Sequence, residues 1–250
     1  MDKFQGLKIG MQSFTLRGFD MPGAIERIAQ LGLKHVEFGK KHLSPENDGQ
    51  RAQAIALCAK HGITISACGV APFGRDESAN RMWFEHARKL DAEVISGNPQ
   101  PDCLDALDSL TDQFKIKVAI HNHGPGSLWP DIETIEKGLK GRSPRIGLCV
   151  DTGHFLRVPV DPVEVLRHFK DCVHAIHLKD MDVDKDGKHG KEFIVGEGPL
   201  DLKAVLKALL EWRFAGPISI EYEVHPENPM EDLKITLANI EKCLTSIKTP

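Results

Sequence analysis

Short apolar runs alternate with amphipathic segments along the whole 250-residue chain. Eight runs of strand-like composition are each followed by a segment whose apolar residues recur at helical spacing, and each unit spans roughly 30 residues. Such alternation predicts parallel strands, because parallel neighbours must be joined by a crossover that is usually a helix. Eight consecutive units match the size and order of a (β/α)8 TIM barrel, and we expect residues 1–250 to form one such α/β domain.

The element boundaries follow from the same patterns. Strands are expected at residues 8–12, 35–38, 63–68, 94–96, 117–122, 146–151, 174–179 and 217–223. Helices are expected from Pro22 to a stop at Gly32, through 52–59 to a stop near Gly62, and at 79–90, 102–114, 131–140, 161–170, 200–212 and 230–247. An open doubly wound sheet is the alternative architecture, but no glycine-rich nucleotide loop follows the first strand.

The longest interval between predicted elements is residues 180–199, which is rich in charge and glycine. In a barrel this interval follows the seventh strand and lies on the face where active sites are built. Two interpretations stay open. The interval is either a solvated surface loop or a partial lid over a substrate, with Glu197 and His189 within reach.

Four of the predicted strands end in ionisable residues. The pairs are His121 with His123, Asp151 with His154, His177 with Lys179, and Glu221 with Glu223. Side chains alternate between the two faces of a strand, so the apolar residues between these positions point the other way. The period-two pattern therefore directs His121, Asp151, His177 and Glu221 into one space at the carboxyl ends of the strands.

A set of nitrogen and oxygen ligands favours a divalent transition metal over an all-oxygen site for calcium. We expect manganese, with cobalt, zinc and magnesium as alternatives. Two other interpretations remain open. Asp151, His177 and Glu221 can form a buried ion-pair network without metal, and His123 can replace His121 as the ligand from the fifth strand.

Composition restricts the classes of partner. The formal net charge of -4 gives no general attraction to nucleic acid or to an anionic membrane, and small molecules fit better. The 6 cysteines form no Cys-x-x-Cys pair, and the opening MDKFQGLKIG lacks the apolar core of a signal peptide. These features predict a soluble cytoplasmic protein with reduced thiols; its oligomeric state stays open, with a homo-oligomer among the possibilities.

Several short motifs occur in a characteristic order. They are Gln12-Ser-Phe-Thr-Leu-Arg17, Val36-Glu37-Phe38, Asp151-Thr-Gly-His154, His177-Leu-Lys-Asp180, Gly196-Glu-Gly198 and the later Glu221. With these motifs the chain resembles the xylose isomerase-like TIM barrels of the sugar phosphate isomerase/epimerase superfamily, over nearly its whole length. The motifs are nearest to those of inosose dehydratase-type or epimerase-type members. Relatives in this superfamily also include hydroxypyruvate isomerases, C-glycoside-cleaving subunits and a DNA-repair endonuclease.

The resemblance implies a ligand set and also shows a departure from it. In the epimerase members, one divalent ion is held by Glu, Asp, His and Glu on strands five to eight. Asp151, His177 and Glu221 match three of these positions, but His121 stands where those members have a glutamate. Those epimerases are thought to use the two glutamates as paired acid and base. The departure therefore argues against two-base epimerisation, and Ile120-His-Asn-His123 is similar to dehydratase-type relatives.

The remaining candidates have one functional and one structural interpretation each. His154 contacts substrate oxygen in the relatives, or forms a hydrogen bond at a helix start. Lys179 polarises a carbonyl, or pairs with Glu223. Glu37 acts as an acid behind the ligands or as a general base, or instead pairs with Arg17.

A second group of candidates concerns substrate contact. His123, Glu197, Phe14 and Trp129 are predicted to contact substrate together with His154, although aromatic residues at strand ends often pack in the core or at the rim. Cys149 is expected only to pack beside the site.

Together these features predict a metal-dependent enzyme that removes a proton α to a carbonyl in a keto-sugar or related polyol. Glu221, His154, Lys179 and Glu37 are the predicted catalytic residues. The outcome is isomerisation or β-elimination. The alternatives are a C3 epimerase of the same superfamily, a metal-dependent phosphodiesterase like the repair endonucleases, and a non-catalytic sugar-binding subunit.

Overall fold

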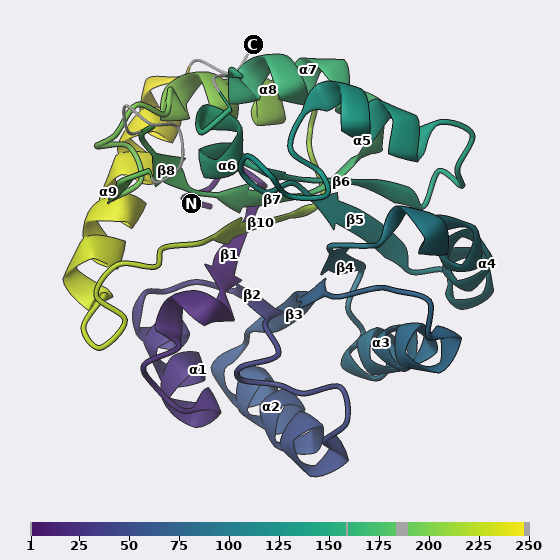
Figure 1. Ribbon diagram of the computed structural model, residues 1–250. Coiled ribbons are helices and arrows are strands. Elements are labelled where there is room, and N and C mark those ends of the chain that lie inside the picture. The colour runs from purple at the N-terminus through teal and green to yellow at the C-terminus, as the bar shows by residue number, and fades with distance from the viewer. Residues whose placement is uncertain (1, 159, 184–189, 248–250) are drawn as a thin grey trace.

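Eight parallel strands close into a barrel in the computed structural model, which describes residues 2–158, 160–183 and 190–247 (Figure 1). The strands are β1 (Lys8–Gln12), β2 (His35–Phe38), β3 (Thr64–Ala71), β4 (Val94–Gly97), β5 (Lys117–His121), β6 (Ile146–Asp151), β7 (Val173–Leu178) and β10 (Pro217–Ile220). They follow one another around the barrel in chain order, and β10 pairs with β1 to close it. The predicted TIM barrel is confirmed. The predicted last strand was too long, because β10 ends at Ile220 and Glu221 lies just beyond it.

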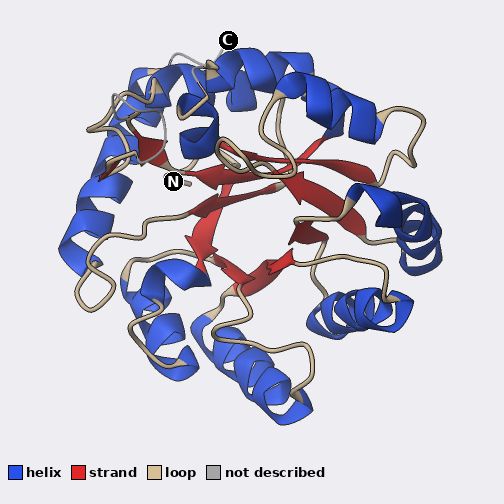
Figure 2. Ribbon diagram, in the orientation of Figure 1, coloured by secondary structure: helices blue, strands red, loops and turns tan. Residues whose placement is uncertain are grey.

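Helices surround the strands as an outer ring (Figure 2). They are α1 (Met21–Gln30), α2 (Asp48–His61), α3 (Glu77–Leu90), α4 (Leu104–Phe114), α5 (Ile132–Leu139), α7 (Pro162–His168), α8 (Leu202–Glu211) and α9 (Met230–Ser246). Most begin at an Asp or Asn whose side chain accepts a backbone N–H of the first turn; Asp20, for example, accepts from Gly23. None of the described helices is long and apolar enough to cross a membrane.

Small side chains fill one layer of the barrel interior. The layer consists of Ala67, Val94, Ala119, Cys149 and Ala175, from five successive strands. Ala119, Cys149 and Ala175 each lie two residues before an ionisable strand-end residue, so the strand pleat places that residue one layer nearer the barrel mouth. The layer therefore forms the floor of the candidate site.

The interval after β7 contains structure that the sequence patterns did not predict. Asp180–Met181 (β8) pairs antiparallel with Glu192–Phe193 (β9). The fully buried Asp180 carboxylate accepts backbone N–H groups of Gly196, Gly198 and Leu200, each at 3.0 Å. A Cβ at residue 198 would lie 2.4 Å from Asp180 Oδ1, so glycine is required there. His189 lies outside the described residues.

Two glycines provide a test of how tightly the barrel is packed. Gly147 lies on β6, where a Cβ would approach Cys172 O to 2.1 Å and the His174 ring to 2.5 Å. The first contact is with backbone, which cannot move aside alone. Gly147→Ala should therefore lower the free energy of unfolding by about 1–3 kcal/mol, measured by denaturant or thermal unfolding. Gly74→Ala is the control, since nothing lies within 4 Å of its Cβ, and equal effects would contradict the packing argument.

Candidate metal centre

Four ionisable side chains meet in the barrel mouth. They are His121 from β5, Asp151 from β6, His177 from β7 and Glu221 just after β10, and one ligand atom of each lies within 4.8 Å of those of the others. His177 Nδ1 lies 2.8 Å from His121 Nε2 and 2.7 Å from Glu221 Oε2. Asp151 Oδ2 lies 3.6 Å from His121 Nε2. These are the four residues that the strand pattern directed into one space; we call them the four-residue cluster.

Asp151 is positioned by groups around its own backbone. Asn122 accepts the Asp151 N–H at 2.7 Å and donates to the Asp151 carbonyl at 3.2 Å. The carboxylate also begins a short helix, α6 (Thr152–Leu156), because Oδ1 accepts the His154 N–H at 2.7 Å. The other oxygen, Oδ2, is directed into the cluster. Sequence reasoning missed Asn122, whereas a hydrogen bond of His154 at a helix start was one of its two interpretations.

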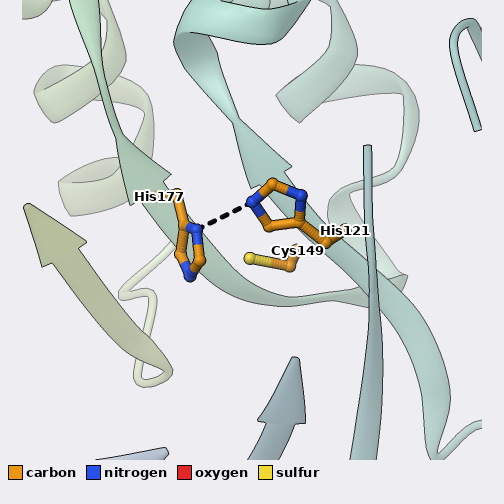
Figure 3. A group of neighbouring side chains, drawn as sticks. All are labelled: His121, Cys149 and His177. Atoms are coloured by element: carbon orange, nitrogen blue, oxygen red, sulfur yellow. Dashed lines mark hydrogen bonds between the residues drawn. The ribbon is translucent and has the colours of Figure 1, made fainter. Parts of the chain in front are cut away.

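Glu37 fixes the orientation of His177. Its carboxylate lies 2.9 Å from His177 Nε2, and since an ionised carboxylate can only accept, Nε2 donates. The hydroxyls of Ser96 and Ser219 donate to the same carboxylate. The Nδ1 atom of His177 is thereby turned toward His121 and Glu221, as Figure 3 shows for His121. A hydrogen-bonded carboxylate behind a histidine is the usual arrangement at metal sites.

Glycine at position 69 makes room for this hydrogen-bond network. A Cβ on Gly69 would lie 2.1 Å from Ser96 Oγ, and the residue has a φ of +154°. Glu37 itself is 1% exposed, so it contacts protein groups and not the open mouth. Arg17 was the alternative partner for Glu37, but it donates to the carbonyl of Glu223.

Charge is unevenly distributed in the cluster. Burial alone would lower the pKa of His177, but its contact with Cys149 and the negative charges of Glu37 and Glu221 raise it well above its usual value. Burial and the positive charge of His177 lower the pKa of His121 well below its usual value. These opposite shifts favour a proton on the His177 ring over one on His121, whose Nε2 lies 2.8 Å from His177 Nδ1. Burial opposes ionisation of Glu221, but Lys179 and His177 lower its pKa.

The donor set fits a divalent cation. Asp151 Oδ2 and Glu221 Oε2 are buried and accept no well-directed hydrogen bond within the described residues. Unsatisfied buried carboxylate oxygens are costly, and a cation among them would remove that cost. The same cation would replace one proton of the His177 imidazole. Two nitrogen and two oxygen donors are typical of sites for manganese, cobalt or zinc.

His123 and His154 form a wall above the cluster. Their ring centroids lie 5.2 Å apart, and His154 Nε2 lies 3.9 Å from Asp151 Oδ2. His123 Nδ1 lies 3.4 Å from His121 Nδ1, so His121 directs its other nitrogen at the cluster. Burial lowers the pKa of His123 and of His154. Both rings are therefore neutral near pH 7 and able to bind a hydroxyl group.

Lys179 lies beside Glu221 in a second group of charges. Its ammonium, 2% exposed, pairs with Glu223 and lies 3.9 Å from Glu221 Oε1. Lys179 thus forms the ion pair with Glu223 that was one of its two predicted interpretations, and it also lies close to the four-residue cluster. On β9, Glu192 accepts the Glu223 N–H at 2.9 Å, and burial raises its pKa to about 7. Sequence reasoning missed Glu192, because no pattern marked its stretch as structured.

The other predicted substrate contacts are not members of the four-residue cluster. Phe14 is half-buried in the segment after β1, under the Arg17 guanidinium at 4.8 Å. Glu197 is exposed on the turn held by Asp180. Trp129 is 1% exposed, and its indole N–H donates to the Pro99 carbonyl at 2.9 Å. The contacts of Trp129 are those of a core residue.

Comparison with known proteins places the chain in a family. Residues 25–243 match the model of the xylose isomerase-like TIM barrel family. The chain belongs to this family. It is 24% identical over 251 residues to an inosose dehydratase of Lactiplantibacillus plantarum, covering 93% of this chain and 75% of that protein. An inosose dehydratase of Clostridium tetani is 31% identical over 144 residues, covering 51% of this chain and 48% of that protein, so the chain spans about half the length of that relative.

Solved structures share the barrel. An uncharacterised protein from Parabacteroides distasonis is 30% identical, with a TM-score of 0.74 over 95% of this chain and 99% of that chain. A D-tagatose 3-epimerase-like protein is 20% identical, also with a TM-score of 0.74, over 95% of this chain and 100% of that chain. At 20% identity, the similarity to the D-tagatose 3-epimerase-like protein shows a shared fold and nothing more.

Substitution of Glu37 tests whether the buried carboxylate positions His177. Glu37→Gln should weaken the binding of Mn²⁺ by about 10–100-fold, because the partner that orients the His177 ring loses its charge. Isothermal titration of metal-free protein with MnCl₂ measures this change. Glu192→Gln is the matched control, a carboxylate of the same mouth that accepts the Glu223 N–H and is not one of the four-residue cluster. Equal weakening by both substitutions would contradict the proposed positioning.

Proposed function

We propose that this protein is a divalent-metal-dependent lyase that removes a proton α to the carbonyl of a keto-sugar or keto-polyol and expels a β-hydroxyl group. The observation that carries the proposal is the four-residue cluster, in which Asp151 Oδ2 and Glu221 Oε2 are buried and accept no well-directed hydrogen bond from the described residues. His121, Asp151, His177 and Glu221 would hold the ion. When bound, such an ion polarises a carbonyl and makes the neighbouring C–H bond more acidic.

Glu221 is the proposed base. Its pKa is lowered, so the carboxylate is ionised at neutral pH. One of its oxygens, Oε2, faces His177, whereas Oε1 is directed toward Lys179. Lys179 is cationic and buried beside this carboxylate, so it would stabilise negative charge that develops on a substrate oxygen. His154 and His123 would bind substrate hydroxyl groups at the wall.

Elimination also needs an acid for the leaving hydroxyl group. The C–H electron pair forms the new C=C bond, the C–O bond breaks, and the departing oxygen takes a proton to leave as water. Glu192 is a candidate donor, since its pKa of about 7 keeps a substantial fraction protonated at neutral pH. His154 is neutral and would hold the hydroxyl in place.

The residue on the fifth strand supports elimination over C3 inversion. Inversion requires a base on each face of the sugar, and the fifth strand supplies His121, whose Nε2 belongs to the cluster. Glu37 is enclosed by His177, Ser96 and Ser219 and does not reach the mouth. The related inosose dehydratases have names that denote loss of water. A C3 epimerase remains the alternative within the family, ahead of a phosphodiesterase or a non-catalytic sugar-binding subunit.

Metal content is the first test. We expect the purified protein to bind about one divalent ion per chain, to lose activity with EDTA and to regain it with Mn²⁺ or Co²⁺. Elemental analysis and titration of metal-free protein measure the stoichiometry. Asp151→Asn should reduce the bound metal by about tenfold or more, whereas exposed Asp161→Asn, at the start of α7, should not. Activity that is unaffected by EDTA, with less than a tenth of an equivalent of metal, would refute the proposal.

Product analysis in deuterated water separates the reaction classes. Metal-loaded enzyme is incubated with inososes, 3-keto-glycosides and free keto-sugars, and the products are followed by NMR. Loss of water or of the β-linked group, with solvent exchange at the α-carbon, is the expected outcome. Inversion at one carbon with every hydroxyl group retained would show that a second base reaches the substrate, and the assignment to a lyase would then be wrong.

A further inference from the structure

Cys149 lies directly beneath the two imidazoles of the cluster. Its thiol is fully buried in the layer of small residues, and Figure 3 shows it beside His121 and His177. The ladder between β5 and β6 pairs Cys149 with His121. One ligand atom each of His121, Cys149 and His177 lies within 4.8 Å of the others. Three donors from three adjacent strands therefore converge in the floor of the site.

This group shares its imidazoles with the four-residue cluster but differs in its third donor. Cys149 and Asp151 are two residues apart on β6, so both point inward, with the thiol one layer deeper than the carboxylate. The other members of the layer are Ala67, Val94, Ala119 and Ala175, which have no donor atoms. The two imidazoles thus have carboxylates on the side of the mouth and a single thiol on the side of the floor.

We propose that His121, Cys149 and His177 form a second, deeper binding site for thiophilic divalent cations such as Cd²⁺ and Zn²⁺. Thiolate sulfur prefers softer cations, whereas Asp151 and Glu221 suit Mn²⁺. Binding replaces the Cys149 thiol proton and one proton of the His177 imidazole with bonds to the metal, and both protons pass to buffer. Two nitrogens and one sulfur provide three of the four positions that zinc takes in proteins.

A cation in the deeper site would also affect the proposed function. This inference rests on that function only because both sites use His121 and His177. A cation bound by Cys149 uses both His121 and His177, so Mn²⁺ cannot use them at the same time. The deeper cation also lies away from Asp151 and Glu221, where substrate would bind. Thiophilic ions are therefore expected to be competitive inhibitors with respect to Mn²⁺ and to form an inactive protein.

The test uses full-length, metal-free protein and CdCl₂ alone. Ultraviolet difference spectra should show a thiolate-to-Cd²⁺ charge-transfer band that saturates near one equivalent. The ¹¹³Cd NMR shift of the unmodified protein should indicate one sulfur ligand. With Mn²⁺ bound first, Cd²⁺ should release it, and the EPR signal of free Mn²⁺ should appear. The NMR measurement needs no variant, so the proposal remains testable if substitution prevents folding.

Variants assign the band to one thiol. Cys149→Ser should remove the band and weaken Cd²⁺ binding by about tenfold or more, while Mn²⁺ affinity changes by less than about threefold. Cys68→Ser is the matched control, because Cys68, on β3 of the same barrel, is also fully buried but belongs to no group of potential metal ligands among the described residues. The band should persist in this variant.

Specific outcomes would overturn the inference. A ¹¹³Cd shift that indicates only nitrogen and oxygen ligands, or a band unchanged in Cys149→Ser, would place Cd²⁺ elsewhere. Simultaneous binding of Cd²⁺ and Mn²⁺ to one protein molecule would show that the two sites do not share His121 and His177. The test of this inference is independent of the test of lyase activity. Sulfur-ligated Cd²⁺ in a protein that lacks lyase activity would refute the proposed function and leave this inference intact.

Discussion

The hydrogen bond between Glu37 and His177 is the interaction on which the candidate site depends. It assigns the proton of Nε2 and directs Nδ1 into the mouth, where His121 and Glu221 meet it. The negative charge of Glu37 is itself tolerable only because neighbouring groups satisfy it: burial would raise its pKa, but the charge of His177 and the hydrogen bonds from His177, Ser96 and Ser219 lower it. A buried ion pair of this kind is weak evidence for stability. Its retention here is better explained by the geometry that it imposes on an imidazole.

Much of the fold and part of the site were predictable from sequence, for one physical reason. A strand alternates its side chains with period two, so the parity of Asp151 and His177 relative to their apolar neighbours already places them on the inner face. Boundaries marked by Asp caps and by glycine were predictable too, as at Gly62, which has a positive φ. The last strand was predicted too long because Tyr222 continues the alternation of apolar and polar residues. In the structure, the pairing of β10 with its neighbours stops at Ile220.

Contacts between distant segments were not predictable, because they depend on how the strands are staggered around the barrel. Nothing local in the sequence says that Glu37 meets Ser96 and Ser219, which lie 59 and 182 residues away along the chain. The same applies to Asn122, whose side chain takes the place of ladder bonds next to Asp151. Cys149 was expected only to pack; its proximity to two imidazoles follows from the pairing of β6 with both β5 and β7. Glu37, Asn122 and the two serines act on the site through other residues, and their signals in sequence are correspondingly weak.

The hairpin of β8 and β9 shows how a charged segment can gain a defined position without a hydrophobic pattern. Asp180, at the end of the strongly predicted seventh unit, accepts three backbone N–H groups from residues 196–200 and so fixes the far end of the segment. Glu192, between these anchors, is held by the Glu223 N–H next to Lys179 and Glu221. Partial desolvation there, opposed only in part by Lys179, brings its pKa near neutrality. Neighbouring charges and hydrogen bonds lower the pKa values of Glu37 and Glu221, so a carboxyl group that gives up a proton near pH 7 comes here from a different element, the β8–β9 hairpin.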